Sequence, residues 1–258
     1  MQKLYCLLAF VVFSISSMAQ FKKLVWADEF NYSGLPDSSK WEYDTGNSGW
    51  GNNELQFYTS KRVNNAAVND GLLTIKAVKE NYQGAAYTSA RLLSRSPGNW
   101  KYGRIEVRAK LPTGRGTWPA IWMLATDQAY GGWPKSGEID IMENVGYNPD
   151  SVFATVHTES YNHTIGTQKT KGLLRTDLST AFHVYAVEWS EKQIEIFIDK
   201  EKYFHFDNEG TGYKAWPFDK QFHLLLNIAI GGGWGGKMGV DDSIFPQQLQ
   251  VDYVRVYQ

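Results

Sequence analysis

Residues 137–144 have the sequence GEIDIMEN, in which charged and apolar residues alternate. Successive side chains of an extended strand point to opposite faces. The first two acids, Glu138 and Asp140, therefore share one face, and the isoleucines share the other. Strict alternation would place Glu143 among the isoleucines, but a one-residue bulge at residues 141–142 returns it to the acidic face. We expect three carboxylates in a row on one surface of a sheet.

The same two-residue period recurs along the chain and predicts the fold class. The segments are rich in Val, Ile, Phe and Tyr, and Gly, Asn, Asp and Pro bound them. They are residues 72–78, 103–110, 151–157, 184–189, 193–199, 222–230 and 250–257. No window shows a convincing apolar period of 3.6 residues. Many short strands separated by turns predict an all-β sandwich or jelly roll. Two terminal strands, 23–26 and 251–257, are candidates to pair with each other.

Composition limits the function classes. The chain has 258 residues, of which 43% are hydrophobic and 21% charged, so disorder and low complexity are excluded. The net charge is −1, which leaves no basic excess for binding nucleic acid. Aromatic residues reach 15%, including 10 Trp, which is more than a core alone explains. Nothing in the sequence suggests an obligate oligomer, and we expect a monomer.

The first 19 residues resemble a secretory signal peptide. Lys3 is followed by the apolar run 4–13 and by small residues up to Ala19, where cleavage is expected. The run is too short to span a membrane. The only cysteine, Cys6, lies in this segment, so the remaining chain has no disulfide. We predict a secreted or periplasmic protein with one domain over residues 20–258 and no membrane partner.

Three carboxylates in a row favour acid–base chemistry. Like charges held close together disfavour simultaneous ionisation, so the pKa of at least one acid rises. A protonated acid beside an ionised one is the requirement for general acid catalysis. Tryptophans flank the acids at Trp118, Trp122 and Trp133, and their rings suit stacking against sugars. Two alternatives are a solvated acidic strand edge and a Ca²⁺ or Mg²⁺ site, although such sites usually gather ligands from loops.

These residues resemble glycoside hydrolase family 16 in its laminarinase-like form. The strongest part is EIDIME at residues 138–143, with the bulge expected above. The resemblance covers nearly all of the chain after the signal. It also includes ADEFN at 27–31, GWGNNELQFYT at 49–59, GTWPAIWML at 116–124, NIAIGG at 227–232 and VDYVRVY at 251–257.

The resemblance implies a β-jelly-roll sandwich of two antiparallel sheets with a substrate cleft on the concave face. It implies a retaining hydrolase in which Glu138 is the nucleophile, Glu143 is the acid/base and Asp140 tunes the pair. No cofactor is implied for catalysis. Other cleft residues suggested by position are four stacking tryptophans and three polar sugar ligands. They are Trp118, Trp122, Trp133 and Trp234, and Asn52, Glu54 and Arg91.

His157 lies at the end of a predicted strand, where alternation places it on one face with Phe153 and Thr155. If that strand neighbours the acidic one, the imidazole can bind Asp140 or a sugar hydroxyl. A purely structural histidine is an equal alternative.

A structural calcium ion is also implied by the resemblance, on the convex side away from catalysis. By position its ligands are Glu29, the carbonyl of Gly71 and Asp252. Carboxylate and backbone oxygens suit this hard cation, and the site would join the two ends of the chain.

The function expected first is a secreted endo-β-1,3-glucanase acting on laminarin-like chains, with a β-glucan as its partner. Alternatives of the same class are a mixed-linkage β-1,3-1,4-glucanase, a transglycosylase and a hydrolase of a marine galactan. A sulfated substrate would require a basic cleft, and near the predicted cleft loops clustered cations occur only at residues 61–62 and at Arg91 with Arg95. A non-catalytic sugar-binding module is the alternative of a different class, but it would leave the acidic row unexplained.

Overall fold

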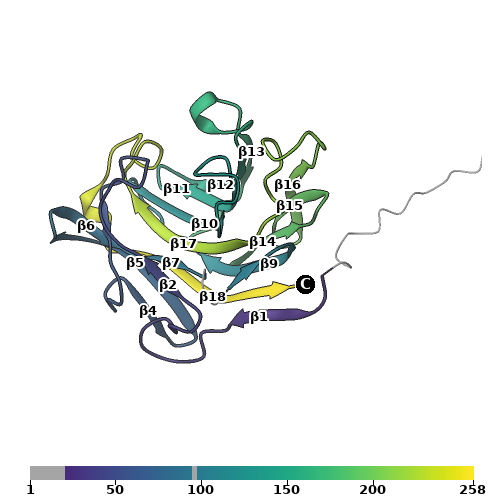
Figure 1. Ribbon diagram of the computed structural model, residues 1–258. Helices are drawn as coiled ribbons and strands as arrows, with labels where there is room; N and C mark the ends of the chain where they lie inside the picture. Colours follow the sequence, from purple (N-terminus) through teal and green to yellow (C-terminus); the bar gives the residue numbers. More distant parts are fainter. Residues whose placement is uncertain (1–20, 95–97) are drawn as a thin grey trace, which may run out of the picture.

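The computed structural model describes residues 21–94 and 98–258. The predicted signal peptide, Cys6 and Arg95 lie outside these residues. Two sheets stack face to face, and loops rise around the outer face of one of them (Figure 1). In the described part of the chain, no helix is long and apolar enough to cross a membrane.

The larger sheet has ten strands in the order β16-β15-β14-β9-β18-β5-β6-β3, with β1 paired to β18 and β4 to β5. All recorded pairings in the fold are antiparallel except that of β3 with β6. The strands are β1 (Leu24–Asp28), β3 (Gln56–Tyr58), β4 (Ala66–Asn69), β5 (Leu72–Tyr82), β6 (Ala85–Ser89), β9 (Gly103–Lys110), β14 (His183–Trp189), β15 (Gln193–Ile198), β16 (Glu201–Asp207) and β18 (Gln247–Tyr257).

The smaller sheet has eight strands in the order β13-β12-β11-β10-β17-β7-β2, with β8 paired to β17. They are β2 (Glu42–Asp44), β7 (Arg91–Leu93), β8 (Asn99–Trp100), β10 (Thr117–Ala125), β11 (Glu138–Val145), β12 (Asn148–His157), β13 (Lys169–Leu174) and β17 (Phe222–Ile230). Two short 3₁₀ turns, η1 (His163–Ile165) and η2 (Asp242–Ile244), lie in connecting loops. All seven segments predicted from alternation are strands, which confirms the all-β sandwich.

The core lies between the sheets and is formed by the apolar positions of the alternating strands. Ile105 and Val107 of β9 face it from the larger sheet, and Ile121 and Met123 of β10 face it from the smaller sheet. Removing such side chains from water is the main driving force for folding. The residues between them in sequence point outward, so the smaller sheet can present polar side chains on its outer face.

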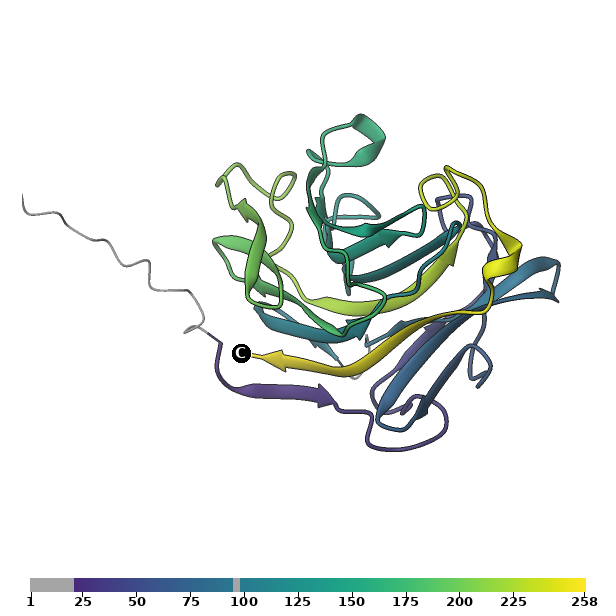
Figure 2. The same ribbon diagram turned by 180° about the vertical axis from the view of Figure 1, so that it is seen from behind.

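The two ends of the described chain pair as predicted. Leu24 lies opposite Tyr257 and Asp28 opposite Val254. Figure 2 shows β1 (purple) running alongside β18 (yellow) at the bottom of the view. Because the terminal strands complete a ladder, both ends are held without a disulfide.

The predicted bulge is present in β11. Toward β10, Trp122 pairs with Asp140 and Ile121 pairs with Met142, which leaves Ile141 without a partner residue. Toward β12, two residues of β11 lie opposite one. The extra residue shifts the alternation by one position, so Glu143 returns to the outer face.

Candidate active site

The outer face of the smaller sheet carries all three acids. Glu138, Asp140 and Glu143 together line a small recess of about 70 Å³. The residues between them, Ile139 and residues 141–142, are buried in the core. The acids sit beneath two larger cavities of about 560 and 430 Å³, which share Glu138 and Asn52 in their walls. These cavities form one cleft, with Glu138 where its two parts meet.

Glu138 accepts hydrogen bonds from two neighbours. The indole Nε1 of Trp133 donates to Oε2 at 2.7 Å, and Asp140 donates from its carboxyl group. Burial raises the pKa of Glu138, and both hydrogen bonds oppose that rise. The donors therefore stabilise the ionised form of Glu138, which a nucleophile requires.

Asp140 is only 2% exposed. Burial and then the charges of Glu138 and Glu143 raise its pKa well above the usual range. A protonated Asp140 can donate to Glu138, whereas an ionised one would repel it. Asp140 therefore stabilises a single negative charge in this recess.

Glu143 lies on the other side of the bulge. Trp118 Nε1 donates to its Oε1 at 2.9 Å. Burial, followed by the charge of Glu138, raises the pKa of Glu143 to about 8. Glu143 is thus protonated at neutral pH and can donate a proton.

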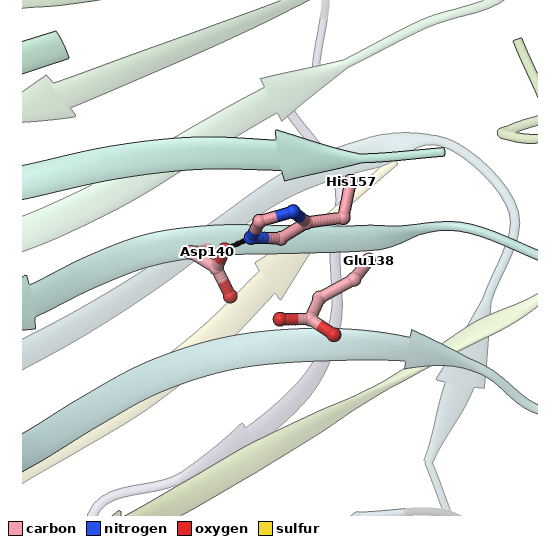
Figure 3. Close-up of side chains that lie close together, drawn as sticks. All are labelled: Glu138, Asp140 and His157. Atoms are coloured by element: carbon pink, nitrogen blue, oxygen red, sulfur yellow. Dashed lines mark ion pairs between the residues drawn. The ribbon is translucent and has the colours of Figure 1, made fainter. Parts of the chain in front are cut away.

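His157 lies on β12 opposite Glu138, and its Nε2 is 3.4 Å from Asp140 Oδ2 (Figure 3). Burial and the neighbouring His163 lower its pKa to about 4, so the imidazole is neutral at neutral pH. The two strands are neighbours, and the imidazole lies beside Asp140, one of the positions that the sequence left open. Within the described residues, ligand atoms of Glu138, Asp140 and His157 lie within 4.8 Å of one another and could hold a small cation. Glycoside hydrolysis by a pair of carboxyl groups does not require a metal ion.

Arg91 and Trp122 form one side of the cleft. The guanidinium carbon of Arg91 lies 4.8 Å from the ring of Trp50 and 4.7 Å from that of Trp122. Its Nε is 3.0 Å from a carboxylate oxygen of Asp44. Arg91 lines the cleft as predicted, and its charge is already balanced there.

Glu54 forms the centre of a polar network in the cleft floor. It accepts hydrogen bonds from Asn52, Gln56 and Tyr58 at 3.1, 2.7 and 3.2 Å. Burial raises its pKa, and these donors oppose the rise. The network fixes the amide of Asn52 in the cleft wall, where a hydroxyl-rich ligand can reach it.

Trp234 reaches the cleft from the glycine-rich loop that follows β17. Its ring centroid is 5.5 Å from that of Trp118 and 5.2 Å from that of Phe153. A Cβ at Gly235 would lie 2.7 Å from Cβ of Trp118, so only glycine permits this approach. The predicted position of Trp234 is confirmed.

All eight predicted substrate residues border the cavities of the cleft. The sequence did not identify the other wall residues, among them Trp50, Phe153, Thr155 and His163. Alternation with His157 already placed Phe153 and Thr155 on the cleft face and could have identified them. His163 lies in the loop between β12 and β13, and its ring is 5.1 Å from that of Trp133, a contact that no local pattern predicts.

Strand pairing brings the residues suggested for calcium to one corner. Val251 pairs with Leu73, and Asp28 pairs with Val254, so Asp252, Gly71 and Glu29 come close together. Arg255 Nε is 2.7 Å from Glu29 Oε1, and Arg108 pairs with Asp252. The oxygen donors suit calcium, but calcium binding would require the ion pairs of Arg255 with Glu29 and of Arg108 with Asp252 to break. The calcium site stays a prediction.

Comparison with known proteins agrees with this geometry. A family model described as glycosyl hydrolases family 16 matches residues 52–255. A beta-glucanase from Rhodothermus marinus is 55% identical over 250 residues, which cover 94% of this chain and 87% of that protein.

Two solved structures are similar throughout. The laminarinase from Rhodothermus marinus has a TM-score of 0.90 at 55% identity, covering 92% of this chain and 97% of the other. SCLam, described as a non-specific endo-beta-1,3(4)-glucanase, has a TM-score of 0.87 at 48% identity, with coverages of 92% and 91%. The chain belongs to glycosyl hydrolases family 16.

Proposed function

We propose that this protein is a retaining endo-β-1,3-glucanase in which Glu138 is the nucleophile and Glu143 is the acid/base. One observation carries the proposal: the bulge at Ile141 places both acids on one cleft wall with Asp140 beside them. Retaining glycosidases need a carboxylate that attacks and a carboxylic acid that protonates, on either side of the bond that is cleaved.

In the first step, Glu143 gives its proton to the glycosidic oxygen and the bond from that oxygen to the anomeric carbon breaks. A carboxylate oxygen of Glu138 attacks the same carbon and forms a glycosyl ester. The proton on Asp140 and the indole of Trp133 hold Glu138 for this attack.

In the second step, the ionised Glu143 removes a proton from water. The water oxygen attacks the anomeric carbon, the bond to Glu138 breaks, and Glu138 leaves as a carboxylate. Two inversions restore the original anomeric configuration. The indole of Trp118 can stabilise the charge of Glu143 between the steps.

A neutral β-glucan is the substrate that the cleft supports best. Trp118, Trp133 and Trp234 supply ring surfaces for sugars. Two of the cations that a sulfated chain would need, Arg62 and Arg91, already pair with Glu80 and Asp44. The names of the similar proteins favour β-1,3-linkages. Because SCLam is described as an endo-beta-1,3(4)-glucanase, mixed-linkage glucan is the second candidate.

The test measures reducing ends released from laminarin, curdlan, barley β-glucan and agarose under identical conditions. We expect release from laminarin and curdlan, with Glu138→Gln as the inactive control. Preferential release from barley glucan would replace the β-1,3 assignment with the mixed-linkage one. Binding without any release would point to a sugar-binding module.

We also propose that the protein is exported, because residues 1–19 resemble a secretory signal peptide. Expression of the full chain in a bacterial host, followed by mass spectrometry of the exported protein, should show a chain that begins at Gln20. A cytoplasmic, uncleaved product would contradict export.

A structural calcium at Glu29, Gly71 and Asp252 is proposed from the corner that β1 and β18 form with the β4–β5 turn. A ligand present at 100 times its dissociation constant stabilises the folded state by about 2.7 kcal/mol. EDTA should therefore lower the Tm of protein kept in calcium buffer, and excess calcium should restore it. An unchanged Tm would mean that no calcium binds there.

A further inference from the structure

A second bulge lies in β16, at the edge of the larger sheet. Ile196 of β15 pairs with Phe204, whereas Phe197 pairs with Lys202, so Tyr203 has no partner residue in the ladder. Lys202 is exposed and Phe204 is buried, although residues two apart in a regular strand share a face. The bulge therefore turns the tyrosine from its regular position and packs it against the core.

The hydroxyl of Tyr203 donates a hydrogen bond of 3.1 Å to the backbone carbonyl of Ile141. Ile141 is the residue that the ladder between β10 and β11 omits. The extra residue of one bulge therefore contacts the extra residue of the other, although the two strands belong to different sheets.

This contact gives the backbone carbonyl at the bulge a hydrogen-bond donor. An extra residue in a bulge leaves the regular ladder, and a buried carbonyl without a partner destabilises the conformation that contains it. Burial raises the pKa of the Tyr203 phenol, and the charges of Glu143 and Asp140 add to the rise. The hydroxyl therefore keeps its proton and remains a hydrogen-bond donor at neutral pH.

The position of this carbonyl determines where Glu143 lies. Glu143 follows Ile141 by two residues, and only the bulged backbone directs it to the cleft. A displacement of about 1 Å in a reacting group can lower a rate by about a hundredfold. Any group that restrains Ile141 also restrains the carboxyl of Glu143.

We propose that Tyr203 is a positioning residue for Glu143: its hydroxyl fixes the bulged backbone at Ile141 and so holds Glu143 in place for proton transfer. The inference rests on the proposed function, because it assigns Tyr203 to the acid/base step. Tyr203 lines none of the cavities of the cleft, so it acts through the backbone of Ile141.

The test compares Tyr203→Phe with Tyr185→Phe. Tyr185 is a fully buried tyrosine of β14 in the same sheet, and among the described residues its hydroxyl has no hydrogen-bond partner. Both changes remove one oxygen atom and keep the ring. Circular dichroism and thermal unfolding establish that each variant is folded.

Two substrates separate positioning from a general structural effect. Cleavage of laminarin needs a proton from Glu143, whereas a dinitrophenyl β-laminaribioside has a leaving group that departs without one. We expect Tyr203→Phe to lower kcat on laminarin by about tenfold or more with KM nearly unchanged. Its kcat/KM on the dinitrophenyl substrate should stay within about threefold of wild type, and Tyr185→Phe should match wild type on both substrates.

Glu143→Gln is the reference, because it should lose laminarin cleavage and keep kcat/KM on the dinitrophenyl substrate. If Glu143→Gln lacks this signature, the acid/base assignment is wrong. If it shows the signature and Tyr203→Phe does not, the positioning role alone is wrong. Wild-type kcat on laminarin, equal losses on both substrates, or failure of Tyr203→Phe to fold while Tyr185→Phe folds would each overturn the proposal.

Discussion

The two outer faces of the sandwich both carry buried carboxylates, but their partners differ. On the larger sheet, Arg104 Nη1 is 2.9 Å from Glu188 Oε1, and Lys202 Nζ is 2.7 Å from Glu195 Oε1. Glu188 and Glu195 are 6% and 4% exposed and lie opposite each other on β14 and β15. A cation next to each acid compensates for the loss of water.

On the cleft face, no Lys or Arg among the described residues lies at hydrogen-bond distance from Glu138, Asp140 or Glu143. Glu138 and Glu143 are bound by the indoles of Trp133 and Trp118, and Asp140 lies between them. Neutral donors compensate only partly for burial, so the protons stay on Asp140 and Glu143. Glutamates on neighbouring strands thus form ion pairs on one face, and in the proposed mechanism the glutamates of the other face react with the substrate. The difference lies in the hydrogen-bond donor next to each acid, which is a cation on the larger sheet and a neutral indole in the cleft.

Replacing one acid on each face should give the largest contrast. Glu138→Gln removes the attacking oxygen, and we expect hydrolysis of laminarin to fall on the order of 10⁴-fold or more. Glu188→Gln makes the same chemical change on the other face and should keep near-wild-type kcat at 25 °C. Equal losses of laminarin hydrolysis in both variants would show that the two faces do not differ in function.

The pH profile should report the cleft acids. Glu143 must be protonated for the first step, and its pKa is about 8. Above that pH, kcat/KM on laminarin should fall about tenfold per unit. The acidic limb belongs to Glu138, whose pKa is raised by burial, so it should lie above pH 4.5. A profile that stays flat to pH 10 would contradict the assignment of Glu143.

Removing one indole donor should have a smaller effect. Trp118→Phe deletes the hydrogen bond to Glu143 and leaves an aromatic ring in the cleft. We expect kcat to fall about tenfold, the equivalent of one hydrogen bond to a charged group. That bond lowers the pKa of Glu143, so its loss should move the alkaline limb to higher pH. A limb that moves to lower pH would show that the indole does not stabilise the carboxylate.

Stability should change in opposite directions on the two faces. The folded state raises the pKa of Glu143, so the stability that its proton provides is present below about pH 4.5 and is lost as pH rises through about 8. Glu143→Gln should therefore gain Tm over wild type as pH rises. Glu188→Gln should lose Tm because Arg104 loses a partner. Each kcal/mol corresponds to about 2–4 °C. Differential scanning fluorimetry at pH 5 and pH 8.5 measures both, and parallel changes would contradict the comparison.

The sequence predicted the fold and most of the site because both depend on two-residue periodicity. Alternation placed Glu138 with Asp140, and the position of Glu143 required a bulge at Ile141 that the structure contains. Family resemblance supplied Asn52, Arg91 and Trp234, which come from distant segments.

What the sequence could not predict depends on contacts between distant elements. The indole bonds from Trp118 and Trp133 to the acids require knowledge of ring orientation, which strand alternation does not provide. His163 reaches the cleft from a loop, and Tyr203 reaches Ile141 from the other sheet through a second bulge. No spacing within one strand indicates either contact.

The central claim is that Glu138 attacks the sugar while Glu143, returned to the same face by the bulge, supplies the proton. A 2-deoxy-2-fluoro laminaribiosyl fluoride should trap the ester, and peptide mass spectrometry should locate the sugar on Glu138. The label on any other residue, or rapid turnover of laminarin with inversion and no trapped ester, would contradict the claim.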